Sequence, residues 1–364
     1  MEKPKFHKNF TLNGFSFTNT DEIVQYVQSF SAETHVFLKD WFSNTAFIVV
    51  QTSGSTGKPK PIKLLKSKMI NSAFATGKFF NLKPKTTALL CLPVQYIAGK
   101  MMLIRAITLG WHLDIVASNA NPLATLNKVY DFSAMVPLQV ENAVDKLHLI
   151  KKLIVGGGVV SNKLQEKLQN ISTQVFATYG MTESITHIAV KKLNHAEGFR
   201  LKKNQKTYYT TLPNTTIYVD ERNCLVIKNE KVTNEIVFTN DVVSLISDTQ
   251  FEWLGRFDNV INSGGVKLHP EKIEEKLSKI IEQHFFVTGI SDEVLGEKLI
   301  LIVEKGISSN LDVNFLSAKI KALKTLSKFE IPKEMYFTES FVETETGKIQ
   351  RKKTLQHLQT SSKS

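Results

Sequence analysis

A segment rich in Gly, Ser, Thr and Lys could bind a chain of phosphates. It reads Thr52-Ser53-Gly54-Ser55-Thr56-Gly57-Lys58-Pro59-Lys60. It follows the apolar run 46–50, whose short length and β-branched residues predict a buried β-strand. Such a loop presents backbone N–H groups, hydroxyls and an ammonium group together, and phosphate oxygens satisfy these donors. The sequence therefore predicts a site for a nucleoside triphosphate; the plain alternative is a polar surface turn.

The segment does not fit the Walker A pattern of NTPases. That pattern requires Gly five positions before Gly-Lys-Ser/Thr, whereas Thr52 stands there and Pro59 follows Lys58. Pro59 has no N–H and no hydroxyl, and its ring disfavours the helical conformation of Lys58. The segment instead resembles the Thr-Ser-Gly-(Ser/Thr)-Thr-Gly-x-Pro-Lys signature of the acyl-adenylate-forming superfamily, which includes acyl-CoA synthetases, adenylation domains and luciferases.

Two further motifs are similar to that superfamily and come in its order. Tyr179-Gly180-Met181-Thr182-Glu183 resembles its Tyr-Gly-x-Thr-Glu motif. The resemblance implies that the Tyr ring packs against adenine, the Thr hydroxyl meets the α-phosphate, and the Glu holds Mg²⁺. Gly156, Gly157 and Gly158 match a glycine-rich loop beside adenine and the acyl group. Taken singly, either motif could be an ordinary turn.

The stretch 253–274 follows the superfamily's longest motif almost throughout. The resemblance implies that Asp248 and Arg256 bind the ribose hydroxyls and that Asp258 is the hinge between two domains. It also implies that Gly264, Gly265 and Lys267 face a channel for the attacking thiol after the second domain swings.

The last motif is Glu345-Thr346-Gly347-Lys348. By resemblance, Lys348 inserts into the active site during adenylation. A carboxylate that attacks an α-phosphate brings negative charges together, so a mobile ammonium group would lower the barrier electrostatically. We therefore expect Lys348, Thr182 and Glu183 to be catalytic, with ATP, Mg²⁺ and coenzyme A as cofactors.

Within the superfamily, the segment 92–99 and Arg105 most resemble the o-succinylbenzoate–CoA ligases of menaquinone biosynthesis. The substrate would be a dicarboxylate, bound near Tyr96 and Gly99, and its second carboxylate would need a counter-charge. Arg105 or Lys100 could supply it, and a bidentate Arg would be the stronger choice. The alternatives are another aryl or fatty acid, a carrier-protein thiol as acceptor, and a non-catalytic nucleotide-binding protein.

Several departures put the acyl specificity in question. Tyr96 replaces a His, Gln51 an aromatic residue, and Ser247 the Gly before Asp248. The family usually has more sequence before its phosphate loop, so an N-terminal subdomain is expected to be absent. A chain shortened in this way could rely on a partner copy in a homodimer.

Composition bounds the class of protein. The chain has 364 residues, 42% hydrophobic and 22% charged, with a net charge of +12. Lys is spread along the chain without a nucleic-acid-binding signature, so we expect anionic small molecules such as ATP and coenzyme A as partners, and no nucleic acid. Two distant cysteines and no apolar run of membrane-spanning length predict a cytoplasmic protein without a membrane span.

The elements that must position these residues predict an α/β fold. Alternating strand and helix patterns over 46–177 predict a large, mostly parallel sheet. Short alternating strands over 208–245 predict a small antiparallel sheet or barrel appended to it. The patterns after residue 258 predict a small α+β domain. We therefore expect an N-terminal adenylate-forming domain over 1–257 and a mobile lid domain over 258–364.

Overall fold

The computed structural model describes residues 5–51, 61–194, 206–305, 312–344 and 349–361, with no side-chain description for 359–361. The predicted phosphate segment, Thr52 to Lys58, and the predicted catalytic Lys348 lie outside the described residues.

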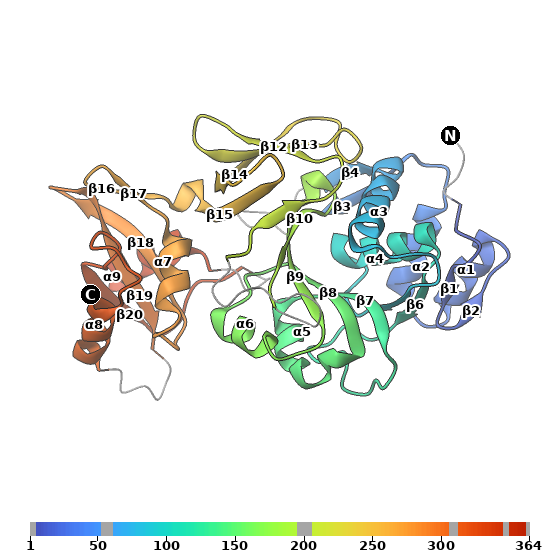
Figure 1. Ribbon diagram of the computed structural model, residues 1–364, viewed down its shortest axis with the longest axis horizontal. Helices are drawn as coiled ribbons and strands as arrows, with labels where there is room; N and C mark the ends of the chain where they lie inside the picture. The colour runs from blue at the N-terminus through green and yellow to red at the C-terminus, as the bar shows by residue number, and fades with distance from the viewer. Residues whose placement is uncertain (1–4, 52–60, 195–205, 306–311, 345–348, 362–364) are drawn as a thin grey trace.

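One 13-stranded sheet forms the larger part of the molecule (Figure 1). Its order is β12-β13-β14-β15-β11-β10-β9-β8-β7-β5-β6-β1-β2. Its strands are β1 Thr11–Leu12, β2 Phe15–Ser16, β5 Thr87–Leu90, β6 His112–Ile115, β7 Tyr130–Met135, β8 Ile150–Val155, β9 Gln174–Gly180, β10 His187–Lys192, β11 Tyr209–Thr211, β12 Thr216–Val219, β13 Cys224–Lys228, β14 Val237–Leu245 and β15 Gln250–Arg256.

Strands β5 to β9 are mutually parallel, and the strands from β10 to β15 join antiparallel. The predicted α/β class is therefore confirmed. The predicted antiparallel strands continue the main sheet at one edge and do not form a separate barrel.

Helices cover both faces of the parallel strands. They are α1 Thr20–Gln28, α2 Ala32–Trp41, α3 Lys66–Phe80, α4 Ile97–Leu109, α5 Pro137–Asn142 and α6 Asn162–Leu168, with the 3₁₀ turns η1 Val144–Leu149, η2 Thr182–Ser184 and η3 Phe257–Asn259. Leu90 packs in the core with α3 and α4, whereas its neighbour Leu89 packs in the core with α5 and α6. The period-2 alternation of a strand thus supplies an apolar face to each layer.

The run 46–50, predicted as a buried strand, lies elsewhere. It forms strand β3, Phe47–Gln51, which pairs with β4, Pro61–Leu65, in a two-stranded antiparallel sheet. Val49 is 50% exposed, so the strand is buried on one face. The Gln51–Pro61 pair closes this hairpin at the two ends of the predicted phosphate segment. A strand therefore follows that segment where a Walker A loop would lead into a helix.

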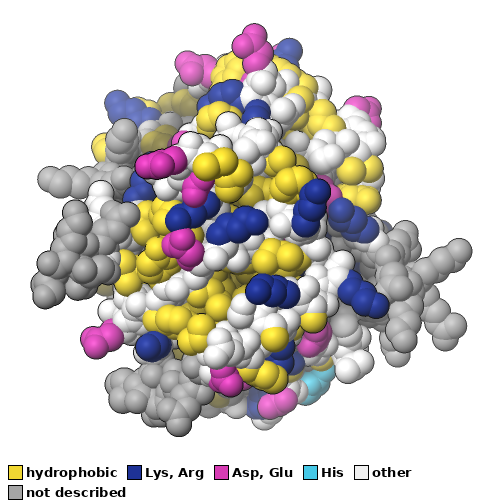
Figure 2. Space-filling view, turned by 90° about the vertical axis from the view of Figure 1, so that its left-hand side faces the viewer, with side chains coloured by type: hydrophobic (Ala, Val, Ile, Leu, Met, Phe, Trp, Pro, Cys, Tyr) yellow, Lys and Arg dark blue, Asp and Glu magenta, His cyan; other side chains and the backbone are white. Residues whose placement is uncertain are grey.

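A second sheet contains β16 Ile261–Ser263, β17 Val266–Leu268, β18 Phe285–Asp292, β19 Gly296–Glu304 and β20 Glu334–Thr338. Helices α7 Pro270–Leu277, α8 Val313–Ala322 and α9 Arg351–Ser361 accompany it. We call β16 to α9 the second lobe and the elements around the 13-stranded sheet the first lobe. The second lobe lies at the left of Figure 1, and its outer face mixes basic, acidic and apolar side chains (Figure 2). No helix in the described ranges is long and apolar enough to cross a bilayer.

Candidate active site

The predicted motifs gather at the carboxyl ends of the parallel strands in the first sheet. β5, β7, β8 and β9 are adjacent and parallel, so the segments that follow them leave the sheet at the same edge. These segments carry residues 91–96, 156–158 and 181–184. Ligands of such sheets bind where the carboxyl ends of the strands open into loops. Motifs that are far apart in sequence therefore face a shared space.

The glycines after β8 allow the neighbouring strand to come close. A Cβ on Gly156 would lie 2.5 Å from the hydroxyl of Thr178, which donates a hydrogen bond to the Val155 carbonyl at 3.1 Å. Gly157 has a φ of +83°, a conformation that other residues adopt at a cost. Gly156 is thus favoured by the Thr178 side chain that packs against it, and Gly157 by its backbone conformation.

Tyr179 joins a polar cluster at the boundary of parallel and antiparallel strands. Its hydroxyl donates a 2.7 Å hydrogen bond to Asp241, which also accepts from Trp253 Nε1 at 3.1 Å and lies 3.5 Å from Arg256. Burial, followed by the negative charge of Asp241, raises the pKa of Tyr179 well above its usual range. The Tyr179 ring lies 5.2 Å from the Phe251 ring. Asp241 is therefore a fixed acceptor inside the region predicted to bind the nucleoside.

Asp248, the residue predicted for the ribose, does not lie in this cluster. It is exposed in the connection between β14 and β15, whereas Asp241 is 6% exposed within β14 and pairs with Arg256 in the sheet. Asp241 is therefore the carboxylate that lies with Tyr179 and Arg256, and the ribose role of Asp248 stays a prediction. The available signal was an acidic residue inside an apolar strand pattern, which is costly without partners.

The segment after β9 makes a tight turn that presents Thr182 and Glu183. The Ser184 hydroxyl donates to the Met181 carbonyl at 3.0 Å, and η2 spans Thr182–Ser184. The next residue, Ile185, is buried with a φ of +67°. A β-branched residue in that conformation is strained, and such strain is typical of functional sites.

Glu183 is exposed at this turn. Within the part of the chain that is described, no group of three or more His, Cys, Asp or Glu side chains could hold a metal. Mg²⁺ commonly binds one or two carboxylates together with substrate phosphates. A single exposed carboxylate fits that mode of binding.

The two candidate cations for an acid substrate differ in their partners. Lys100 donates to the carbonyls of Val94 and Gln95, both at 2.7 Å, so its ammonium group braces the loop. Arg105 is 1% exposed, and among the described residues it has no ion pair with a carboxylate. Burial lowers the pKa of Arg105 to about 9, which leaves it charged at neutral pH.

The loop before α4 carries the other two predicted substrate residues. A Cβ on Gly99 would lie 2.2 Å from the Pro93 carbonyl oxygen, so only Gly lets the loop and the helix approach. Tyr96 is 49% exposed at the first residue before α4. Both residues follow β5 in the chain, at the end of the sheet where the other motifs also lie.

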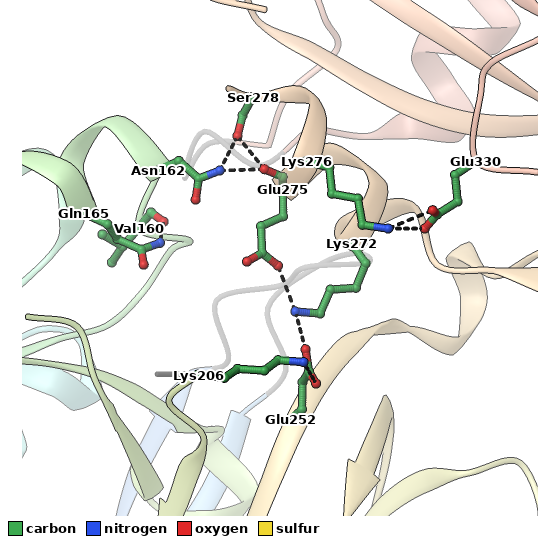
Figure 3. A network of polar contacts seen from close by, with 10 residues as sticks. All are labelled: Val160, Asn162, Gln165, Lys206, Glu252, Lys272, Glu275, Lys276, Ser278 and Glu330. Atoms are coloured by element: carbon green, nitrogen blue, oxygen red, sulfur yellow. Dashed lines mark hydrogen bonds and ion pairs between the residues drawn. The ribbon is translucent and has the colours of Figure 1, made fainter. Parts of the chain in front are cut away.

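The second lobe meets the first through polar groups on α7 (Figure 3). Lys272 lies 2.8 Å from Glu252 of β15 and 2.8 Å from Glu275 of its own helix. Asn162 of α6 donates to the Glu275 carbonyl at 2.5 Å and to the Ser278 hydroxyl at 2.8 Å. These contacts hold α7 against β15 and α6.

Three predicted residues lie in this lobe and one at its start. Asp258 is exposed in η3, which links β15 to β16. Gly264 and Gly265, with φ of +57° and +80°, form the turn between β16 and β17, and Lys267 follows in β17. This hairpin lies at the outer end of the second lobe, away from β8 and β9 (Figure 1). The described orientation therefore does not bring the predicted thiol-channel residues to the other motifs.

Comparisons with known proteins agree with this arrangement. The family model described as AMP-binding enzyme matches residues 39–244. A 2-succinylbenzoate–CoA ligase of Staphylococcus epidermidis is 26% identical over 334 residues, which cover 84% of this chain and 68% of that protein.

Solved structures share the fold. An acyl-CoA synthetase (AMP-forming)/AMP-acid ligase II-like protein from Dyadobacter fermentans is 38% identical, with a TM-score of 0.58, and the match covers 90% of this chain and 94% of that one. The o-succinylbenzoate coenzyme A synthetase of Bacillus subtilis in complex with ATP and magnesium has a TM-score of 0.69 at 17% identity, covering 93% and 82%.

Proposed function

Because this chain belongs to the AMP-binding enzyme family, we propose that it is an adenylate-forming acid–CoA ligase and that its acid is o-succinylbenzoate. The family predicted from the sequence is confirmed by the match over more than half of the chain. The observation that carries the proposed acid is a buried Arg105 without a carboxylate partner among the described residues, close to the strand edge that holds the nucleotide motifs.

The proposed nucleotide subsite consists of Tyr179, Asp241 and Arg256 with the glycines 156–158. Asp241 is oriented by Tyr179 and Trp253, so its carboxylate needs no rearrangement to accept hydroxyl groups. An acceptor fixed in advance loses less entropy on binding. This arrangement supports binding of a ribose.

Glu183 would hold Mg²⁺ together with phosphate oxygens, and the ion would supply positive charge for the phosphates of ATP. The neighbouring Thr182 offers a hydroxyl to the α-phosphate. Both side chains come from η2, whose turn is fixed by Ser184.

The proposed reaction has two halves. A carboxylate oxygen of the acid attacks the α-phosphorus, the bond to pyrophosphate breaks, and an acyl-adenylate forms. The sulfur of coenzyme A then attacks the acyl carbon, AMP leaves, and a thioester forms. We further propose that Lys348 acts in the first half and that the second lobe turns about Asp258 between the halves.

The second carboxylate of o-succinylbenzoate would meet Arg105 rather than Lys100. The ammonium group of Lys100 already donates to two carbonyls of the loop before α4, and the Arg105 guanidinium is more deeply buried and has only weak contacts with neutral groups among the described residues. A buried charge without a counter-ion is costly, and a ligand carboxylate would offset that cost. The structure thus favours one of the two cations that the sequence left open.

The test is acid-dependent exchange of pyrophosphate into ATP. We expect exchange with o-succinylbenzoate to exceed exchange with benzoate, short fatty acids and amino acids. Silence with o-succinylbenzoate together with exchange for another acid would reject the proposed acid and keep the ligase. Silence with every acid, despite ATP binding, would favour a non-catalytic nucleotide-binding protein.

Other features stay predictions. These are the division into domains at Asp258, the homodimer, the lack of a nucleic-acid partner and a cytoplasmic location. The assignments of Gly264, Gly265 and Lys267 to a thiol channel also depend on the proposed rotation.

A further inference from the structure

Arg105 lies in a buried polar cluster contributed by three elements. Thr76 comes from α3, Arg105 from α4, and His187 from the start of β10, with Thr186 just before that strand. The Arg105 Nε donates to the Thr76 hydroxyl at 3.3 Å. Its Nη2 lies 3.5 Å from the Thr186 hydroxyl and 3.5 Å from His187 Nδ1. His187 lies outside the motifs that the sequence predicted to be functional.

The hydrogen bonds assign one tautomer to His187. The Thr76 hydroxyl donates its proton to the Ser72 carbonyl at 3.1 Å. It can therefore only accept from Arg105 Nε and from His187 Nε2, which lies 3.3 Å away. The proton of the neutral ring is thus on Nε2, and the lone pair on Nδ1 faces the guanidinium.

The cluster carries a single positive charge. Burial, followed by the charge of Arg105, lowers the pKa of His187 well below its usual range. A protonated ring would place two cations 3.5 Å apart in a buried site, which is strongly unfavourable. The ring therefore accepts from Arg105 and leaves the charge on the guanidinium.

The cluster lies directly against the 179–183 motif. His187 pairs with Gly180 in the sheet. A Cβ on Gly180 would lie 2.2 Å from the Thr186 carbonyl oxygen and 2.5 Å from the His187 Cα, so the two backbones touch. The guanidinium is therefore held beside the backbone segment that presents Thr182 and Glu183.

We propose that His187 is a positioning residue that aims Arg105 at a second anionic group of the acid, and so sets the preference for a dicarboxylate over the matching monocarboxylate. The inference rests on the proposed function for the identity of the reaction. His187 acts through Arg105 and does not touch the reacting atoms. Thr76 holds the other side of the ring and fixes the tautomer.

The test compares o-succinylbenzoate with two analogues that each lack one carboxylate, 4-oxo-4-phenylbutanoate and 2-butanoylbenzoate. Whichever analogue is turned over lacks only the carboxylate that does not react. The measured quantity is the ratio of kcat/KM for the dicarboxylate to kcat/KM for that analogue. For His187→Leu we expect the ratio to fall about tenfold or more, mainly through KM, because a hydrogen bond to a charged group is lost.

Conservative variants separate positioning from loss of structure. His187→Asn keeps an acceptor near the Nδ1 position and is expected to recover part of the ratio. Thr76→Val removes the hydroxyl with little change of shape and is expected to lower the ratio even if His187→Leu does not fold. Ser133→Ala is the matched control, because this buried hydroxyl donates to the Leu89 carbonyl at 3.0 Å outside the cluster. It is expected to leave the ratio unchanged.

Equal losses for both acids in His187→Leu and Thr76→Val, or no change in either, would overturn the inference. Failure of the proposed function gives a different result, since the wild-type protein would then ignore o-succinylbenzoate. In that case the ratio of kcat/KM is measured for the same variants with the acid that the protein does use and with the analogue of that acid that has one carboxylate more or fewer. A wild-type protein with no preference for a second carboxylate in any acid would also overturn the inference.

Discussion

Replacing Lys272 by Met should loosen the contact between the two lobes. Lys272 bridges Glu252 of the first lobe and Glu275 of its own helix, each at 2.8 Å. The side chains of Lys272 and Glu252 are 23% and 15% exposed, so their ion pair is partly shielded from solvent. Glu252 also lies 2.6 Å from Lys206 and keeps this partner in the variant. The expected loss is therefore near the upper end for surface pairs, about 1 kcal/mol.

A loss of about 1 kcal/mol changes an equilibrium constant about fivefold. If the second lobe alternates between the described orientation and another, the odds of the described orientation should fall by that factor. Single-molecule energy transfer can measure these odds with dyes on cysteines introduced at Val36 and Val294, which are 67% and 88% exposed in the first and second lobes. The native Cys91 and Cys224 are buried and compete little for the dyes.

The control lies one turn along the same helix. Lys276 pairs with Glu330 at 2.6 Å within the second lobe, so Lys276→Met removes an ion pair without touching the first lobe. We expect it to leave the odds unchanged. Added salt should lower the odds in the wild-type protein more than in Lys272→Met. Equal effects of the two substitutions, or none from Lys272→Met, would refute the assignment of the contact.

The ion pair of Lys272 with Glu252 should not make the odds depend on pH near neutrality. Burial raises the pKa of Glu252, but hydrogen bonds from Lys206 and Lys272 outweigh it, so the pKa lies below its ordinary value of 4.5. The ionised carboxylate therefore stabilises the described orientation above pH 4.5, and this stabilisation is lost only as pH falls through the lowered pKa. Burial lowers the pKa of Lys272, yet its bonds to Glu252 and Glu275 raise it overall above 10.5, so its contribution is present below that value. These two groups therefore give the odds no pH dependence between about pH 6 and 9.

Three further predictions concern single residues. Asp241→Asn should raise the KM for ATP about tenfold through loss of a charged acceptor, while Asp248→Asn should leave this KM within about twofold. Equal effects of the two substitutions would contradict the proposal that Asp241 binds the ribose. His187→Asn should remove part of the loss of unfolding free energy at acid pH. A buried His whose pKa is lowered destabilises the folded state below about pH 6.5, by up to about 1.4 kcal/mol per pH unit. Denaturation at pH 7.5 and 5.5 measures this loss. Gly99→Ala should cost about 1–3 kcal/mol of unfolding free energy because its Cβ meets a backbone carbonyl, whereas Gly158→Ala, whose Cβ has ordinary contacts, should cost less.

Local sequence patterns predicted the parallel half of the first lobe well. The alternating strand and helix patterns expected over 46–177 correspond to the helices α3 and α4 and to the parallel strands β5, β8 and β9. These elements combine a periodic apolar pattern with a clear stop, such as Asn81 and Gly110 in the left-handed conformation after their helices. Where the pattern and the stop agree, the chain has few alternatives.

Partners distant in sequence were not predictable in the same way. The run 46–50 is apolar enough for a central strand, yet its hairpin with β4 leaves one face exposed. The apolar strand pattern around Asp241 signals a buried carboxylate, but it does not reveal which groups that carboxylate meets. Tyr179 and Trp253 reach Asp241 from other strands. Such a choice of partners depends on the order of strands in the sheet, which periodicity does not encode.

The buried cluster and the contact between the lobes give different tasks to two positive charges, Arg105 and Lys272. Arg105 is held by neutral groups in the interior, so its positive charge is weakly screened. It would attract a ligand that places an anionic group beside the guanidinium. Lys272 is paired with carboxylates at the surface between the lobes, so its charge is already compensated and contributes to orientation. Selectivity for the acid and orientation of the second lobe should therefore respond to separate substitutions. Because the clusters share no residue, their free-energy effects are expected to add.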